Sequence, residues 1–286
     1  FHISLAVFLV GLIRSVSSKT AEEIVSVQGD SVMPFIDGYV LNDTFASAFE
    51  SGNYNKVPII LGNNEDEFKP FLPYVLGSFP TSTGHTWSEV YDVLGFTDKS
   101  LPLDQFMPSD SYDRELYETI AKYPSMNWKA AMVDSLARSL KKHQDDVYCY
   151  YFKWKGIGAK VPFDFLVGAG HSFELPFFFG WDRGMWRDVT YSEKNDKGRE
   201  SLQNAMMSYI ASFTESGNPN KKGRNLPKWE TWSNISGAPK SIIFDADLNK
   251  SKIGMMNEEF KKEDIMNEIN KLPSWQRDII MALIWM

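Results

Sequence analysis

Apolar residues in this chain come in short runs that alternate with longer stretches of mixed apolar and polar positions. Three of the short runs are rich in β-branched and aromatic residues: "KVPIILG", "DVYCYYFKW" and "KSIIFDADLN". The first predicts a short buried strand over 57–61 that stops at Gly62 and leads into a polar turn. The other two predict further short strands within 146–154 and 240–249.

The mixed stretches have the spacing of amphipathic helices. In "NWKAAMVDSLARSLKKH", Ala131, Leu136 and Leu140 share one apolar face, and two lysines follow at the C-terminal end, where cations favour the helix dipole. A later helix stops at Gly217, shortly before a proline. The sequence predicts helices at 111–123, at 127–143, from 199 to Gly217, and in the charged tail from Glu258.

Strands that alternate with helices predict an α/β fold, with a mostly parallel sheet flanked by helices. The sequence contains no internal repeat and no low-complexity tract. Functional side chains of such sheets gather in loops beyond the carboxyl ends of the strands. The loops that follow the first two predicted strands are therefore the places to search for chemistry.

Composition narrows the class of protein. The chain has 286 residues, 43% of them hydrophobic, so it can bury a large core as one large domain or two small ones. Its net charge of −7 gives no reason to expect a nucleic-acid or anionic-membrane partner. The aromatic content of 14% suits a large core and equally an apolar substrate pocket.

The single cysteine, Cys149, excludes an intrachain disulfide and a cysteine-based metal site. It lies within the apolar run "DVYCYYFKW", which indicates a small buried side chain rather than a nucleophile.

Two features bear on the compartment. The apolar run "ISLAVFLVGLI" near the N-terminus has the length of a signal-peptide core and is too short to span a membrane. The alternative, which we favour, is a helix whose upstream context is missing. Glycosylation triplets at Asn42, Asn234 and Asn249 lean weakly toward an extracellular protein, and the compartment stays open.

Candidate chemistry follows the first two strands. The first leads into Glu65, Asp66 and Glu67, and His171 stands in a loop after the second. A carboxylate that binds an imidazole Nδ1 proton orients the ring for general-base catalysis, and acid before histidine is the chain order of α/β-hydrolases. The alternatives are a solvated acidic turn and a structural histidine.

Five segments extend this pattern. "VPIILGNNEDEF", "VYCYYFKW", "GAGHSFELPFFFG", "FTESGNPN" and "LPKWETW" occur in the order found in type-B carboxylesterases, the family that includes cholinesterases, and the chain resembles the C-terminal half of that family's fold. The resemblance implies that residues 1–286 form the C-terminal portion of one α/β-hydrolase domain.

The family's serine–glutamate–histidine triad, carried onto matching positions, implies Glu67 as the acid and His171 as the base. Glu174 matches a family acid that supports the histidine without touching substrate. Phe177, Phe178 and Phe179 would line an ester pocket, or simply pack in the core. The resemblance implies a small-molecule ester as substrate, the family's N-terminal half as a possible partner, and neither a metal nor an organic cofactor.

The departures from the family concern the nucleophile. No G-x-S-x-G motif is complete: Ser31 and Ser172 follow a G-x pair, but neither is followed by the second glycine. The family's glycine-rich oxyanion loop has no match either. We therefore expect the chain by itself to be inactive. Two alternatives remain: a non-catalytic, neuroligin-like interaction protein, and an unrelated α/β binding module.

Overall fold

The computed structural model of the protein describes residues 36–76, 84–86, 88–89, 111–159, 163–181, 190–220 and 225–284. The N-terminal apolar run and Ser31 lie outside these residues. The chain divides into two units, Phe1–Phe45 and Ala46–Met286. In the described part of the first unit, the Asp37 carboxylate accepts three backbone N–H groups and closes a turn. All elements described below belong to the second unit, apart from the first residue of helix α3.

The second unit contains a four-stranded sheet in the order β1-β2-β3-β4. Strands β1 (Ile59–Asn64), β2 (Val147–Phe152) and β3 (Ser241–Ala246) are parallel, and β4 (Ser251–Met256) pairs antiparallel with β3. The predicted mostly parallel sheet is confirmed. Strand β1 runs beyond the predicted stop at Gly62 to Asn64, and β4 was not predicted.

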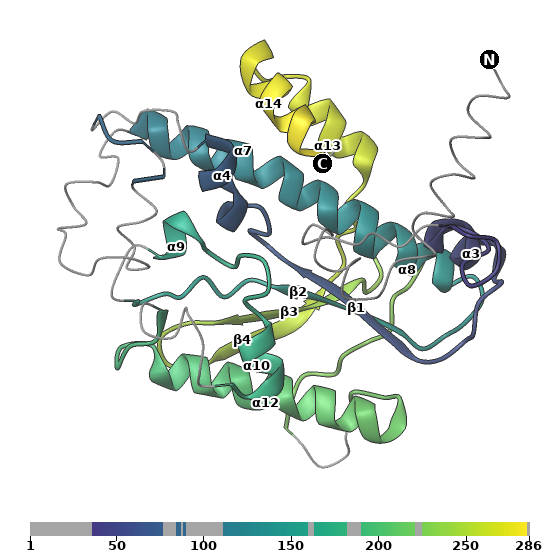
Figure 1. Cartoon of the computed structure of the whole chain (residues 1–286). Helices are drawn as coiled ribbons and strands as arrows, with labels where there is room; N and C mark the ends of the chain where they lie inside the picture. The colour runs from purple at the N-terminus through teal and green to yellow at the C-terminus, as the bar shows by residue number, and fades with distance from the viewer. Residues whose placement is uncertain are drawn as a thin grey trace, which may run out of the picture. The chain divides into compact units, whose positions relative to one another are not determined.

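Helices cover both faces of the sheet (Figure 1). The long helix α7 (Ser111–Lys129) and its continuation α8 (Ser135–Leu140) lie on one face and provide the crossover from β1 to β2. Helix α12 (Asp196–Ser216) lies on the other face and belongs to the crossover from β2 to β3. The remaining helical segments are α3 (Phe45–Ser51), a 3₁₀ turn (Lys69–Phe71), α4 (Leu72–Leu76), α9 (Phe163–Leu166), α10 (Leu175–Phe179), α13 (Lys262–Ile269) and α14 (Ser274–Ile284).

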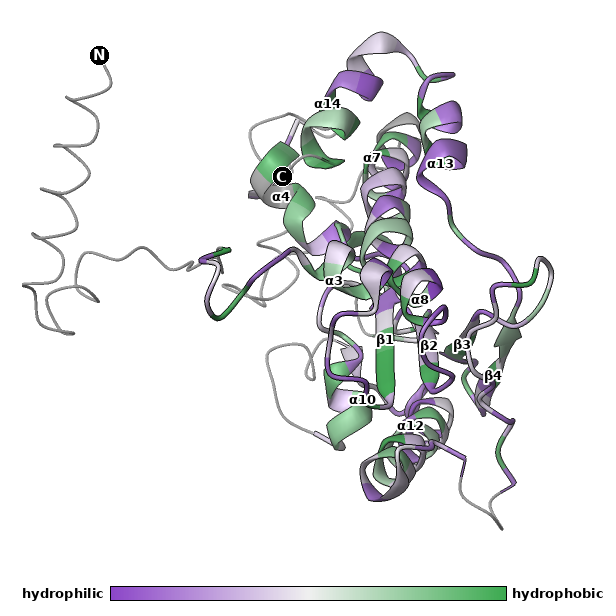
Figure 2. Ribbon diagram, turned by 90° about the vertical axis from the view of Figure 1, so that its right-hand side faces the viewer, coloured by the Kyte–Doolittle hydropathy of each residue, from purple (hydrophilic) through white to green (hydrophobic). Residues whose placement is uncertain are grey.

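Strand β2 is buried on both faces, which explains its nearly continuous apolar sequence. Its side chains alternate: Tyr148 and Phe152 join the main core cluster with α12, whereas Val147 and Cys149 join a cluster with α8. The prediction of a buried Cys149 is confirmed, and burial raises the pKa of its thiol. Figure 2 shows the apolar strands β1 and β2 between the α7–α8 layer and the α10–α12 layer.

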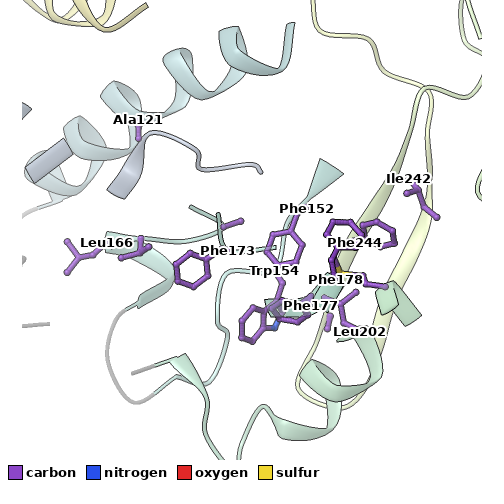
Figure 3. Packing of buried hydrophobic residues seen from close by; sticks show 14 of the residues in the cluster. Ala121, Phe152, Trp154, Leu166, Phe173, Phe177, Phe178, Leu202, Ile242 and Phe244 are labelled. Atoms are coloured by element: carbon purple, nitrogen blue, oxygen red, sulfur yellow. The ribbon is translucent and has the colours of Figure 1, made fainter. Parts of the chain in front are cut away.

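The main core is built from aromatic rings (Figure 3). Phe177 packs against Phe152 and Trp154, with ring centroids 5.1 and 4.9 Å away. Phe178 packs against Phe244 at 5.9 Å. Much of the high aromatic content therefore fills the space between the sheet, α10 and α12.

The two helices predicted at 111–123 and 127–143 are one continuous helical run that includes Pro124. Between α7 and α8, residues Ala130–Asp134 form a π-helical turn, which rotates the following residues relative to a regular α-helix. The predicted apolar face is right for Leu140, which is buried, and wrong for Ala131, which is exposed; Leu136 is half-buried. The other buried apolar positions are Ala130, Val133 and Ala137.

Candidate active site

Strands β1 and β2 are parallel, so the loops after them meet at one edge of the sheet. We call residues 64–67 the acid turn and residues 168–174 the histidine loop. Two reciprocal hydrogen bonds join them: the Asp66 N–H donates to the Ala169 carbonyl (2.9 Å), and the Ala169 N–H donates to Asp66 Oδ2 (3.0 Å). This backbone clamp brings Glu67 and His171 to the same place.

The glycines of "GAGH" permit this close approach. Gly168 has φ +56°, and a Cβ on it would lie 2.2 Å from Asp66 Oδ2. A Cβ on Gly170 would lie 2.5 Å from Cγ of Pro70. Side chains at either position would push the histidine loop away from the acid turn.

Glu67 and His171 form a direct hydrogen bond, with 2.8 Å between Glu67 Oε2 and His171 Nδ1. The other carboxylate oxygen, Oε1, accepts the Asn64 N–H at 2.7 Å. The Glu67 side chain is 6% exposed and the His171 side chain 44% exposed. The acid is thus fixed and buried, while the imidazole reaches solvent.

The surroundings favour the protonated imidazole. The hydrogen bond with Glu67 raises the pKa of His171 above its usual value, partial burial opposes this, and the charges of Glu67 and Glu174 add to it. Burial also raises the pKa of Glu174. The Glu174 carboxylate accepts hydrogen bonds from Asn64 Nδ2 (2.5 Å) and from the Tyr150 hydroxyl (3.3 Å).

Two aromatic rings contact the imidazole. The centroid of Phe71 lies 5.5 Å from that of His171, and the centroid of Trp128 lies 5.3 Å away. Trp128 belongs to α7 and stands two residues before the π-helical turn, whereas Phe71 follows the acid turn. The rings limit the movement of the imidazole and give the site an apolar wall.

The three predicted pocket phenylalanines separate into two groups. Phe177 and Phe178 are buried in the core cluster, so the alternative of core packing applies to them. Phe179 is 59% exposed and stacks on the exposed ring of Trp181, with centroids 5.2 Å apart. Of the three, only Phe179 is exposed, and the prediction of an ester pocket lined by these rings stays a prediction.

The residues beside Glu67 do more than flank it. Asp66 is buried, forms the clamp to Ala169, and pairs with Lys69 (3.4 Å) and Lys155 (3.0 Å). Glu65 pairs with Lys153 and also with Lys155. Sequence reasoning gave Asp66 no role and overlooked Asn64, because their partners are distant in the chain and local pattern does not reveal them.

This arrangement can accept a proton. With Nδ1 bound to a buried carboxylate, the Nε2 side of His171 is available as a general base, and Glu67 would stabilise the resulting imidazolium. Ser172 follows on the same loop, is exposed, and has a left-handed φ of 67°. Within the described residues, no three His, Cys, Asp or Glu side chains are grouped to hold a metal ion. None of the helices described above combines the length and apolar character needed to cross a membrane.

The chain is similar to known proteins both in sequence and in structure. The model of the carboxylesterase family matches residues 11–264. Mouse (Mus musculus) acylcarnitine hydrolase is 28% identical over 237 residues, which are 76% of this chain and 39% of that protein. Acetylcholinesterase 1 of Caenorhabditis elegans is 27% identical over 221 residues, 70% of this chain and 34% of that protein.

A solved PNB esterase structure superposes with a TM-score of 0.51 at 17% identity, covering 92% of this chain and 50% of that one. It supports the α/β-hydrolase fold. The chain spans between a third and two fifths of the length of these curated relatives.

Proposed function

Because the chain belongs to the carboxylesterase family, we propose that Glu67 and His171 are the acid and base of a serine–glutamate–histidine triad that hydrolyses carboxylic esters. The observation that carries this proposal is the 2.8 Å hydrogen bond between a buried Glu67 carboxylate and a solvent-reaching His171. A buried acid that orients a 44% exposed imidazole is the arrangement that a general base requires.

In the proposed reaction, His171 Nε2 takes the proton of a serine hydroxyl as the serine oxygen attacks the ester carbonyl carbon. Glu67 balances the charge of the imidazolium. His171 then gives that proton to the departing alcohol, and an acyl-enzyme remains. The same nitrogen then takes a proton from water as the water oxygen attacks the acyl-enzyme, and it returns that proton to the serine oxygen as the acid leaves.

The class of substrate is proposed no more narrowly than carboxylic esters. The relatives named above are an acylcarnitine hydrolase and an acetylcholinesterase, whose names give different alcohols. Phe71 and Trp128 beside the imidazole supply an apolar surface that suits an ester.

The nucleophile is tested first. Since the sequence holds no complete G-x-S-x-G motif, the chain alone should hydrolyse p-nitrophenyl esters no faster than a denatured control, which subtracts the background from free imidazole. Joined to the N-terminal half of a family member, it should gain turnover that an organophosphate titrates at one serine per site.

Variants of the joined protein then test the two residues. His171→Ala should lower turnover by several orders of magnitude, and Glu67→Gln should lower it less, because the base itself remains. Full turnover in His171→Ala would refute the assignment. Organophosphate-sensitive turnover by the chain alone would point to Ser172 or Ser31 as the nucleophile. A folded but inactive joined protein would favour the non-catalytic, neuroligin-like alternative.

A further inference from the structure

Asn64, the last residue of β1, is completely buried beneath the Glu67–His171 pair. Its backbone N–H donates to Glu67 Oε1 at 2.7 Å. Its side-chain Nδ2 donates to the Gly170 carbonyl at 2.7 Å and to Glu174 Oε2 at 2.5 Å. One residue thus holds the acid of the pair and two points of the histidine loop, one on each side of His171.

The orientation of the Asn64 amide is determined by these partners. Both groups that face Nδ2 are acceptors, so a flipped amide would bring Oδ1 against a carbonyl and a carboxylate. In the orientation observed, Oδ1 is buried and has no hydrogen-bond partner among the residues that the structure describes. Asn64 therefore acts through its two N–H donors, and its acceptor contributes nothing to this cluster.

Asn63 provides a natural comparison. It is also buried at the end of β1, but successive side chains of a strand point to opposite faces. Its Nδ2 donates to the Asn64 carbonyl (3.0 Å), and among the described residues its side chain makes no hydrogen bond to the histidine loop. The two asparagines share residue type, strand and burial, and differ in what their amides hold.

We propose that Asn64 is a positioning residue, which fixes the geometry of the Glu67–His171 pair by joining the acid turn to both sides of the histidine loop. Its meaning for catalysis rests on the proposed function, whereas the geometry can be tested without any turnover. The clamp between Asp66 and Ala169 holds only the start of the loop, whereas the Asn64 amide joins the acid turn to Gly170 and to Glu174, which the Tyr150 hydroxyl also holds.

The test is an NMR titration of the His171 imidazole in the chain as it stands, with the resonance assigned by its loss in His171→Gln. The charged groups that face this ring are Glu67 on the acid turn and Glu174 on the histidine loop. Asn64→Leu, which keeps the size and removes the donors, should lower the measured pKa by about 0.5 or more, a threefold change in the ionisation constant. Asn63→Leu should leave it unchanged.

Two further variants keep the test decisive. If Asn64→Leu does not fold, Asn64→Ser, a smaller polar side chain that cannot reach both partners, should shift the pKa in the same direction. In a Glu67→Gln background the effect of Asn64→Leu should largely vanish, because the effect is transmitted through Glu67. Equal shifts in the Asn63 and Asn64 variants, or no shift in either, would overturn the proposal.

Turnover distinguishes this proposal from the proposed function. In the joined protein, Asn64→Leu should lower kcat, leave KM nearly unchanged and move the acidic limb of the pH profile to lower pH. If the joined protein has no turnover, the esterase proposal fails, and the titration still decides the role of Asn64.

Discussion

His171 has two different surroundings, because Nδ1 faces a buried carboxylate while the other side of the ring faces solvent and two aromatic side chains. The pairing of Glu67 with His171 was predicted from chain order and family resemblance, and the 2.8 Å bond confirms their proximity. Asn64, Asp66 and Trp128 could not be predicted as members of the site. Their partners are set by how two loops and a helix meet, which no local pattern records.

The His171–Glu67 bond should make stability depend on pH. Because the folded pKa of His171 is raised above its unfolded value, near 6.5, the stabilisation is fully present below pH 6.5 and is lost as pH rises through the folded pKa. His171→Gln should therefore cost more free energy of unfolding at pH 5.5 than at pH 8.5, measured by urea denaturation. His143→Gln, whose ring contacts the Glu50 carbonyl, serves as the control. An equal cost at both pH values would contradict the prediction.

Glu174 should influence the same titration through its charge. Glu174→Gln keeps the shape and removes a negative group that raises the pKa of His171, so the pKa should fall. NMR titration of the imidazole measures this directly. An unchanged pKa would show that Glu174 is uncharged in the folded protein, and a rise would show that the histidine loop has moved.

The glycine that lets the two loops meet gives a stability prediction. Gly168→Ala should cost about 3 kcal/mol or more, since it combines a left-handed φ with a Cβ placed on the Asp66 carboxylate. Gly237 also has a left-handed φ, of +73°, but a Cβ there meets nothing within 4 Å. Gly237→Ala should cost only about 1 to 2 kcal/mol. Equal costs in urea denaturation would mean that the contact with Asp66 is unimportant.

At the scale of helices and strands, the sequence predicted those elements whose own residues strongly favour one type of secondary structure. The three predicted strands carry β-branched and aromatic runs, and all three are in the sheet. Strand β4 has the sequence "SKIGMM", with a glycine and no aromatic residue, and its pairing depends on the preceding hairpin. The helix predicted over 111–123 continues through Pro124, where Tyr123 and Met126 pack against the C-terminal helices.

A buried ion pair spans the π-helical turn: Lys129, the last residue of α7, pairs with Asp134 at 2.5 Å, and both side chains are fully buried. Asp134 Oδ2 also accepts the Phe260 N–H. Asp134→Leu should destabilise the fold by about 3 to 5 kcal/mol, because Lys129 would stay buried without its partner. The double variant Lys129→Met/Asp134→Leu should recover much of this loss, but not the bond to Phe260. A double variant that is less stable than Asp134→Leu would contradict this account.

At the scale of the whole molecule, the edge of the sheet at β1 should determine whether the chain self-associates. In the part of the chain that the structure describes, β1 pairs with β2 on one side only. An apolar strand with free backbone groups on its outer side invites another strand. The chain in isolation should therefore self-associate and bind hydrophobic dyes. Analytical ultracentrifugation over a range of concentrations tests this, and a monodisperse, dye-silent monomer with a cooperative melt would contradict it.

The π-helical turn between α7 and α8 also marks a place where the chain could be one residue shorter. Such a turn takes up one residue more than an α-helical turn, so removing one residue from 130–134 would leave a regular helix with the same faces on either side. Ala131 and Met132 are exposed, and losing either would place Lys129 and Asp134 four positions apart, on one face of an α-helix. A relative one residue shorter here would align with this chain through a single gap and bury the same residues before and after it.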